Sequence, residues 1–149
     1  MLFIGAPFMP SYRKKNHLNF DSVFELLKRE KVIKFIDLGS GDGRVVADFA
    51  KAGFKSYGVE INPILVWWSK REIRKAKIDN TKIIWGNMWK THLKDFDAIF
   101  IFHFKTANKY LIEKFRKELK PGVIIISAGF SLPGFNLIKK EGVFLIYKV

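Results

Sequence analysis

Short apolar runs alternate with amphipathic, helix-like stretches from about residue 20 to about residue 120 of this chain. Runs that are apolar on both faces are typical of buried strands, and their regular alternation with helices is typical of a parallel sheet. We therefore expect an α/β fold with a doubly wound, mostly parallel sheet. The expected strands are 34–38, 56–60, 82–85, 98–102 and 123–127.

The stretches around these strands have helical spacing. Asp21 is expected to cap the first helix, and Pro63 suits the first turn of another. The expected helices are 22–29, 44–52, 63–76 and 107–119. The remaining C-terminal segment is expected to form an antiparallel hairpin, 136–139 with 143–148, about Glu141 and Gly142.

Length and composition fit one domain, 1–149, because 48% hydrophobic residues can form one sizeable core and no linker divides the chain. Cysteine is absent, which excludes disulfides and thiol nucleophiles. The longest apolar runs fall short of the roughly 18 residues that a membrane span needs, and residues 1–10 lack a signal-peptide pattern. We expect a cytoplasmic protein that is not an integral membrane protein.

The chain has 27 Lys and Arg against 14 Asp and Glu, a formal net charge of +13. Such a charge attracts nucleic acids, anionic membrane surfaces or acidic proteins. Basic residues such as Lys70, Arg71 and Arg74 are also spread along expected helices, as on any solvated face. The charge alone leaves the class of partner open.

A glycine-rich turn at residues 35–44 joins the first expected strand to a helix, the place where open α/β sheets bind ligands. Gly39, Gly41 and Gly43 let the backbone approach a ligand without side-chain obstruction. The amides at the start of the following helix are expected to receive a carboxylate. A tight turn without a ligand would explain one such glycine more readily than three.

Two common nucleotide motifs are excluded by the spacing. Neither G-x-G-x-x-G register is complete, because Arg44 or Val46 occupies the third glycine position, and no Lys followed by Ser or Thr closes a P-loop. The D-x-G-x-G-x-G spacing that begins at Asp37 instead resembles the first motif of class I methyltransferases. This resemblance implies their Rossmann-like fold, S-adenosylmethionine as cofactor, S-adenosylhomocysteine as product, and no metal.

Glu60 ends the second expected strand, about as far from the glycine loop as the roughly 20 residues typical of a ribose-binding acid. The resemblance implies that Asn87 or adjacent backbone reads the adenine edge while Ile61 packs on its face, although an Asn after a strand also commonly caps a turn. The expected cofactor-binding residues in this part of the chain are Asp37, Gly39, Ser40, Gly41, Gly43, Glu60, Ile61, Asn62, Asn87 and Met88.

Four stretches resemble a narrower group, the protein-lysine methyltransferases that include the enzyme acting on the c-ring protein of ATP synthase and broad-specificity archaeal enzymes. These stretches are 6–11, 37–44, 58–63 with 65–69, and 86–90. The resemblance implies methyl transfer to a protein lysine ε-amine. It also implies that the N-terminal part, 1–31, covers the cofactor and substrate, with Met9, Pro10 and Ser11 at the cofactor.

Lysine methylation requires a neutral amine. A lysine with a pKa near 10.4 is neutral in about one molecule in 2,500 at pH 7, so presenting that form costs roughly 4.6 kcal/mol. An apolar channel and nearby positive charge lower this cost without a dedicated catalytic base. The expected channel walls are Phe8, Phe102, Phe104 and Phe130, each of which also fits ordinary packing.

Two other functions stay open. A nucleic-acid methyltransferase, acting for example on RNA, would suit the charge of +13, but the Asn/Asp-Pro-Pro-aromatic turn typical of base-amine methyltransferases is replaced by 102–105, Phe-His-Phe-Lys. A catalytically silent module that binds S-adenosylmethionine or nucleic acid is the other. Because a basic enzyme repels basic substrates, a protein substrate is expected to be acidic, membrane-embedded or associated with nucleic acid.

Overall fold

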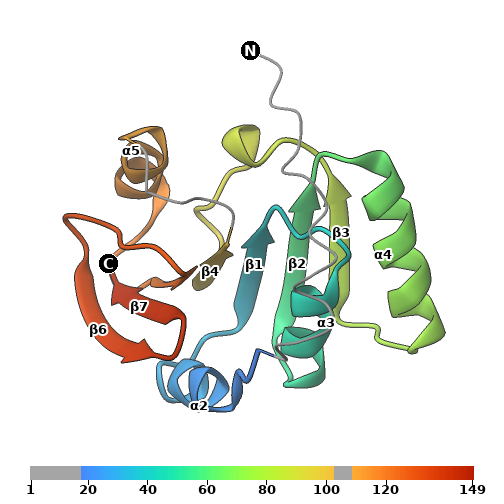
Figure 1. The fold of residues 1–149 in the computed structure, drawn as a ribbon, viewed down its shortest axis with the longest axis horizontal. Helices are drawn as coiled ribbons and strands as arrows, with labels where there is room; N and C mark the ends of the chain where they lie inside the picture. The colour runs from blue at the N-terminus through green and yellow to red at the C-terminus, as the bar shows by residue number, and fades with distance from the viewer. Residues whose placement is uncertain (1–17, 103–108) are drawn as a thin grey trace.

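The computed structural model describes residues 18–102 and 109–149, which form one seven-stranded sheet with helices on both faces (Figure 1). The strand order is β3-β2-β1-β4-β5-β7-β6. The strands are β1 (Lys34–Leu38), β2 (Lys55–Glu60), β3 (Thr81–Trp85), β4 (Ala98–Ile101), β5 (Ile124–Ala128), β6 (Asn136–Glu141) and β7 (Phe144–Lys148).

The first five strands are parallel, and β7 and β6 add an antiparallel edge. This arrangement confirms the doubly wound, mostly parallel sheet with a C-terminal hairpin. The order of the strands reverses between β1 and β4, because β2 lies on one side of β1 and β4 on the other. Such a switch point opens a crevice at the carboxyl ends of the strands.

The helices divide between the two faces of the sheet. Alternate strand residues contact opposite clusters: Phe35 packs with α2 and α3, whereas Ile36 packs with α5. A third cluster joins α3 to α4 and β3, so α2, α3 and α4 share one face. The helices are α2 (Asp21–Arg29), α3 (Arg44–Lys51), α4 (Pro63–Lys75) and α5 (Lys109–Glu118), with a short 3-10 turn, η1 (Met88–Lys90).

Aromatic packing anchors the loop-bearing strand to its helix. The rings of Phe35 on β1 and Phe49 on α3 stack with centroids 3.7 Å apart, and both side chains are fully buried. Phe20 meets Phe49 edge-on at 5.0 Å. Burial of this size stabilises the fold by about 1.5–3 kcal/mol per side chain. The strand and helix that flank the glycine loop are therefore held rigidly.

Two expected details of the elements differ from the structure. Asp21 is the first residue of α2 rather than its cap, and Asn19 Oδ1 accepts the Asp21 N–H at 2.9 Å. The first hairpin strand extends to Glu141 and the second begins only at Phe144, so the turn lies at Gly142 and Val143 rather than at Glu141 and Gly142. Within the described ranges no helix is both long and apolar enough to cross a membrane.

Candidate functional site

The glycine loop leaves the carboxyl end of β1 and turns back onto β2. Gly39, Gly41 and Gly43 all have positive φ, at 85°, 55° and 77°, a conformation that glycine adopts without steric cost. The carbonyl of Val59 on β2 accepts N–H groups from both Gly39 (2.8 Å) and Ser40 (2.9 Å). The loop is thus fixed to the neighbouring strand.

Two glycines of the loop, Gly41 and Gly43, and one of β2, Gly58, differ in what a Cβ atom at their position would meet. A Cβ on Gly43 would lie 2.6 Å from Cβ of the fully buried Ser69 on α4, and one on Gly58 would lie 2.6 Å from Oγ of Ser40. These two glycines are required by packing. A Cβ on Gly41 would have no heavy atom of the described residues within 4 Å. Among these residues nothing fills the space beside Gly41, where the sequence predicts the ligand.

Glu60 connects the loop to the end of β2. Its Oε2 accepts the N–H of Gly41 at 2.9 Å, and its Oε1 accepts the N–H of Asn62 at 2.9 Å. The side chain is largely buried. A carboxylate has about four lone-pair positions, so two of them remain for hydroxyl donors.

Two of the amides that were expected to receive a ligand carboxylate donate hydrogen bonds within the loop, and their role at a ligand stays a prediction. Gly43 N–H donates to the carbonyl of Ser40 at 2.9 Å. The N–H of Arg44 donates to Oδ1 of Asp42 at 3.2 Å. The loop uses these donors to hold its own shape.

The site is acidic although the chain is strongly basic. Asp37 is buried on β1, and burial, followed by the nearby charges of Glu60 and Asp42, raises its pKa well above the ordinary value. A buried strand seldom carries a carboxyl group without a functional reason. Among the described residues no three His, Asp or Glu side chains are grouped as a metal site requires. The charges of Glu60 and Asp42, which raise this pKa, create a local negative field that suits an organic cation.

The next residues, Ile61 and Asn62, lie between β2 and α4, and Asn62 is the N-cap of α4. Ile61 is 44% exposed, as an apolar surface for a planar ligand would be. Its carbonyl accepts the indole N–H of Trp85 at 3.0 Å. The Asn62 side chain caps α4 by accepting the N–H of Ile64 at 3.0 Å, whereas the backbone N–H of Asn62 donates to Glu60.

Asn87 follows β3 and caps η1, where its Oδ1 accepts the N–H of Trp89 at 2.9 Å. Its carbonyl also accepts the hydroxyl of Thr91 at 3.0 Å. Of the two interpretations left open by the sequence, capping is observed, and the adenine role stays a prediction. Met88 is half-buried and packs against the cluster on the α5 face.

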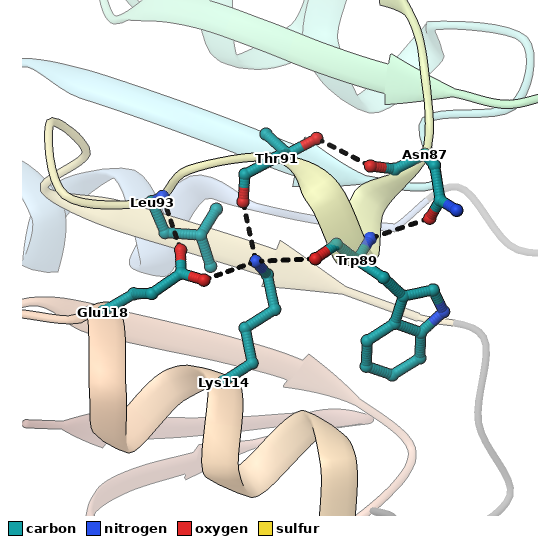
Figure 2. A network of polar contacts seen from close by, with 6 residues as sticks. All are labelled: Asn87, Trp89, Thr91, Leu93, Lys114 and Glu118. Atoms are coloured by element: carbon teal, nitrogen blue, oxygen red, sulfur yellow. Dashed lines mark hydrogen bonds and ion pairs between the residues drawn. The ribbon is translucent and has the colours of Figure 1, made fainter.

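A buried lysine, which the sequence did not single out, fixes this turn to α5 (Figure 2). Lys114 Nζ donates to the carbonyls of Trp89 (3.3 Å) and Thr91 (2.7 Å) and to Oε1 of Glu118 (2.7 Å). The other carboxylate oxygen, Oε2, accepts the N–H of Leu93 at 2.9 Å. The sequence signal was only an i, i+4 Lys–Glu pair, which is typical of exposed helix faces as well.

Two of the expected channel residues lie in different apolar clusters. Phe102 is half-buried and packs against the cluster with α2 and α3, whereas Phe130 is buried in the cluster with α5. The carbonyl of Phe130 also accepts the hydroxyl of Ser127. Their role in a channel stays a prediction. The other expected site residues, Phe8, Met9, Pro10, Ser11 and Phe104, lie outside the described residues.

The fold matches that of known methyltransferases. An RNA methyltransferase from Salinibacter ruber, solved with S-adenosyl-L-homocysteine, superposes with a TM-score of 0.68 at 22% identity, over 86% of this chain and 89% of that one. The molecule thus has the Rossmann-like fold of class I methyltransferases. The model of the ANTKMT methyltransferase domain matches residues 37–139, and the chain belongs to this family.

Relatives give a finer comparison. The chain is 32% identical over 131 residues to the rat (Rattus norvegicus) lysine N-methyltransferase of the ATP-synthase c-subunit, covering 87% of this chain and 58% of the rat protein. It is 33% identical over 103 residues to a protein-lysine N-methyltransferase of Saccharolobus islandicus, covering 67% of this chain and 64% of that protein. The chain thus spans less than two thirds of the length of either relative.

Proposed function

We propose that the protein transfers a methyl group from S-adenosylmethionine to the ε-amine of a lysine in a protein substrate. The observation that carries the proposal is the acidic site beside an open glycine, formed by Gly41, Asp37 and Glu60 at the switch point of a methyltransferase fold. The names of the relatives, both lysine N-methyltransferases, support lysine as the acceptor.

The residues of the site fit this cofactor. The two remaining acceptor positions of Glu60 suit a pair of ribose hydroxyls, and exposed Ile61 suits one face of an adenine ring. The negative charge around Asp37 suits the cationic amino-acid end. Bound there, S-adenosylmethionine supplies an activated methyl group on a sulfonium.

The protein's own contribution to methyl transfer is to align and desolvate the acceptor lysine. Alignment of reacting groups supplies up to about 7–11 kcal/mol, which exceeds the roughly 4.6 kcal/mol needed to present a neutral amine. Phe102 and Phe130, at the ends of β4 and β5, are the described aromatic residues on the edge where the acceptor would enter. Apolar walls there favour the uncharged amine.

The charge of the protein restricts its substrate. With a net charge of +13, the enzyme attracts a lysine that lies in an acidic surface, in a membrane protein among anionic lipids, or in a protein bound to nucleic acid. A free, strongly basic protein would be repelled. The same charge supports the alternative of a nucleic-acid methyltransferase.

The experiment that tests the proposal is incubation with methyl-labelled S-adenosylmethionine and a lysate of the source cell. Samples are then treated with nuclease or protease before the macromolecules are precipitated. Label lost only after protease supports the proposal. Label lost after nuclease overturns it in favour of nucleic-acid methylation, and absence of label despite measurable cofactor binding overturns it in favour of a silent binding module.

A further inference from the structure

Helix α4 and the edge strand β3 carry a group of exposed apolar side chains, which we call the tryptophan face. Ile64 on α4 is 73% exposed, Trp67 on the same helix 61%, and Trp85 at the end of β3 67%. The remaining member, also solvent-exposed, is Trp68. Three of the chain's four tryptophans therefore lie on this face. Contiguous exposed apolar surface of this kind marks an interaction site.

These side chains are neighbours on a fixed scaffold. The indole N–H of Trp85 donates to the carbonyl of Ile61 at 3.0 Å, which joins β3 to the start of α4. Ile64, Trp67 and Trp68 are spaced three and four residues apart, so they share one side of the helix. The opposite side of α4 is buried against α3 and β3 through Val66 and Ile73. In Figure 1, α4 lies beside the edge strand β3.

Basic side chains follow the apolar ones along α4, and we call them the basic rim. Helix α4 contains four basic residues and a single acid, Glu72, which is paired with Arg71 at 3.6 Å and Lys75 at 3.9 Å. The other exposed basic residues of α4 are Lys70 and Arg74. A helix with tryptophans and aliphatic residues beside lysines and arginines is typical of segments that lie in the interface of an anionic membrane.

We propose that the tryptophan face docks on a membrane surface with anionic headgroups. The basic rim is complementary to such headgroups, and each Lys or Arg near the surface adds to the attraction. The indole N–H of Trp85 already has a protein partner, so its ring can enter an apolar layer without leaving a donor unpaired.

Two competing occupants fit these observations less well. A second copy of this chain would bring one basic rim against another, which is repulsive. Single-stranded RNA would need open indole faces, but the Arg71 guanidinium lies over the rings of Trp67 at 5.9 Å and Trp68 at 5.6 Å. Exposed aliphatic side chains such as Ile64 also offer nothing to a stacked base.

The test is co-sedimentation of the full chain with lipid vesicles, which needs neither cofactor nor substrate and so stands apart from the proposed function. Vesicles of phosphatidylcholine alone are compared with vesicles that also contain phosphatidylglycerol. We expect binding to the anionic vesicles, a decrease with added salt, and a blue shift of tryptophan fluorescence. The double variant Ile64→Ser/Trp67→Ser is expected to lower the partition coefficient by about tenfold or more.

Matched controls replace exposed apolar residues elsewhere. Ile33→Ser and Tyr110→Ser change side chains that are 60% and 62% exposed, and they are expected to bind vesicles like the unaltered chain. Failure of the unaltered chain to bind anionic vesicles overturns the proposal, whatever the variants do. Equal loss in the control variants also overturns it. RNA retardation that depends on Ile64 and Trp67, without vesicle binding, would assign the face to nucleic acid instead.

Discussion

The carboxylate of Glu60 accepts the backbone N–H of Gly41 at 2.9 Å, although Glu60 ends β2 and Gly41 lies in the loop after β1. This bond links the acid expected to hold a ribose to the glycine beside which the cofactor space is open. One side chain thus shapes the loop and is also expected to contribute to ligand recognition. Its two tasks can be separated by substitution.

Glu60→Ala is expected to weaken S-adenosylmethionine binding by about a hundredfold, because hydrogen bonds to a charged group contribute about 1.5–3 kcal/mol each. Glu60→Gln retains one acceptor oxygen and is expected to lose less. Calorimetric titration of the cofactor measures both losses. Glu113→Gln, which alters an exposed carboxylate on α5, is the control, and unchanged affinity in the Glu60→Ala variant would contradict the site.

Substitution of Gly41 is expected to affect mainly cofactor binding, and substitution of Gly58 mainly folding stability. Gly41→Val fills the open space and blocks the cofactor, while its positive φ costs about 1–2 kcal/mol of folding stability. Gly58→Ala places a methyl group against Ser40 and Val46 and is expected to lower the free energy of unfolding by about 1–3 kcal/mol. Urea denaturation and cofactor titration distinguish the two effects. Full cofactor affinity in Gly41→Val would refute the open position beside this glycine.

Asp37 is expected to make cofactor affinity depend on pH. Its pKa is raised by burial and by the charges of Glu60 and Asp42, so affinity for the cationic cofactor should rise as pH rises through that pKa. Methylthioadenosine, which lacks the amino-acid end, is expected to show a much smaller dependence. If the affinities of the two ligands change with pH in the same way, Asp37 does not interact with the cationic end of the cofactor.

The same group also affects stability in the absence of the cofactor. A raised pKa in the folded state means that the protonated carboxyl favours folding, and this contribution is lost as pH rises through the folded pKa. Asp37→Asn is therefore expected to remove this loss of stability with rising pH while weakening cofactor binding. Thermal unfolding from pH 4 to pH 8 measures the effect, and a variant whose stability falls with pH as that of the unaltered protein does would contradict this sign.

Lys114→Met is expected to lower the free energy of unfolding by about 1–3 kcal/mol, because it leaves the half-buried carboxylate of Glu118 without its cation and two carbonyls without their donor. Lys117→Met, an exposed change on the same helix, should stay within about 0.5 kcal/mol. Denaturant titration of both variants gives the comparison. A similar, small effect of both changes would contradict a structural role for the Lys114 network.

The ion pair of Lys114 and Glu118 also predicts a loss of stability in acid. Burial alone would raise the pKa of Glu118, but hydrogen bonds from Lys114 and from the N–H of Leu93 outweigh it and lower the pKa. A lowered folded pKa stabilises the protein above the unfolded value of about 4.3 and loses that contribution as pH falls through the folded pKa. This loss is expected to be smaller in Lys114→Met. If the free energy of unfolding of this variant falls with pH as that of the unaltered protein does, Lys114 is not the cause of the lowered pKa of Glu118.

Phe130→Ala is expected to reduce stability as well as turnover, because the ring is buried in the cluster with α5. Removal of a buried phenylalanine costs about 3–5 kcal/mol. Phe130→Leu retains most of the volume and is the better probe of a channel: a selective loss of turnover, with cofactor affinity intact, is expected. Equal losses of turnover and affinity would place the ring at the cofactor or in the core alone.

The sequence predicted the sheet because each parallel strand is a local apolar run. It predicted the glycine loop because three alternate glycines directly follow the first of these runs. The contacts of Glu60 with Gly41 N–H and of Lys114 with two carbonyls could not be predicted, since they join segments whose relative placement depends on the whole fold. Asn87 shows the same limit, because one side chain fits both a cap and a ligand contact.

The most direct test of the central claim is residue analysis of the labelled product. Protein labelled from methyl-labelled S-adenosylmethionine is hydrolysed to amino acids, with the unaltered enzyme and the Glu60→Ala variant compared side by side. We predict that the label appears as ε-N-methyl-lysine with the unaltered enzyme and is strongly reduced with the variant. Label in any other residue, or equal methyl-lysine from both proteins, would contradict the account.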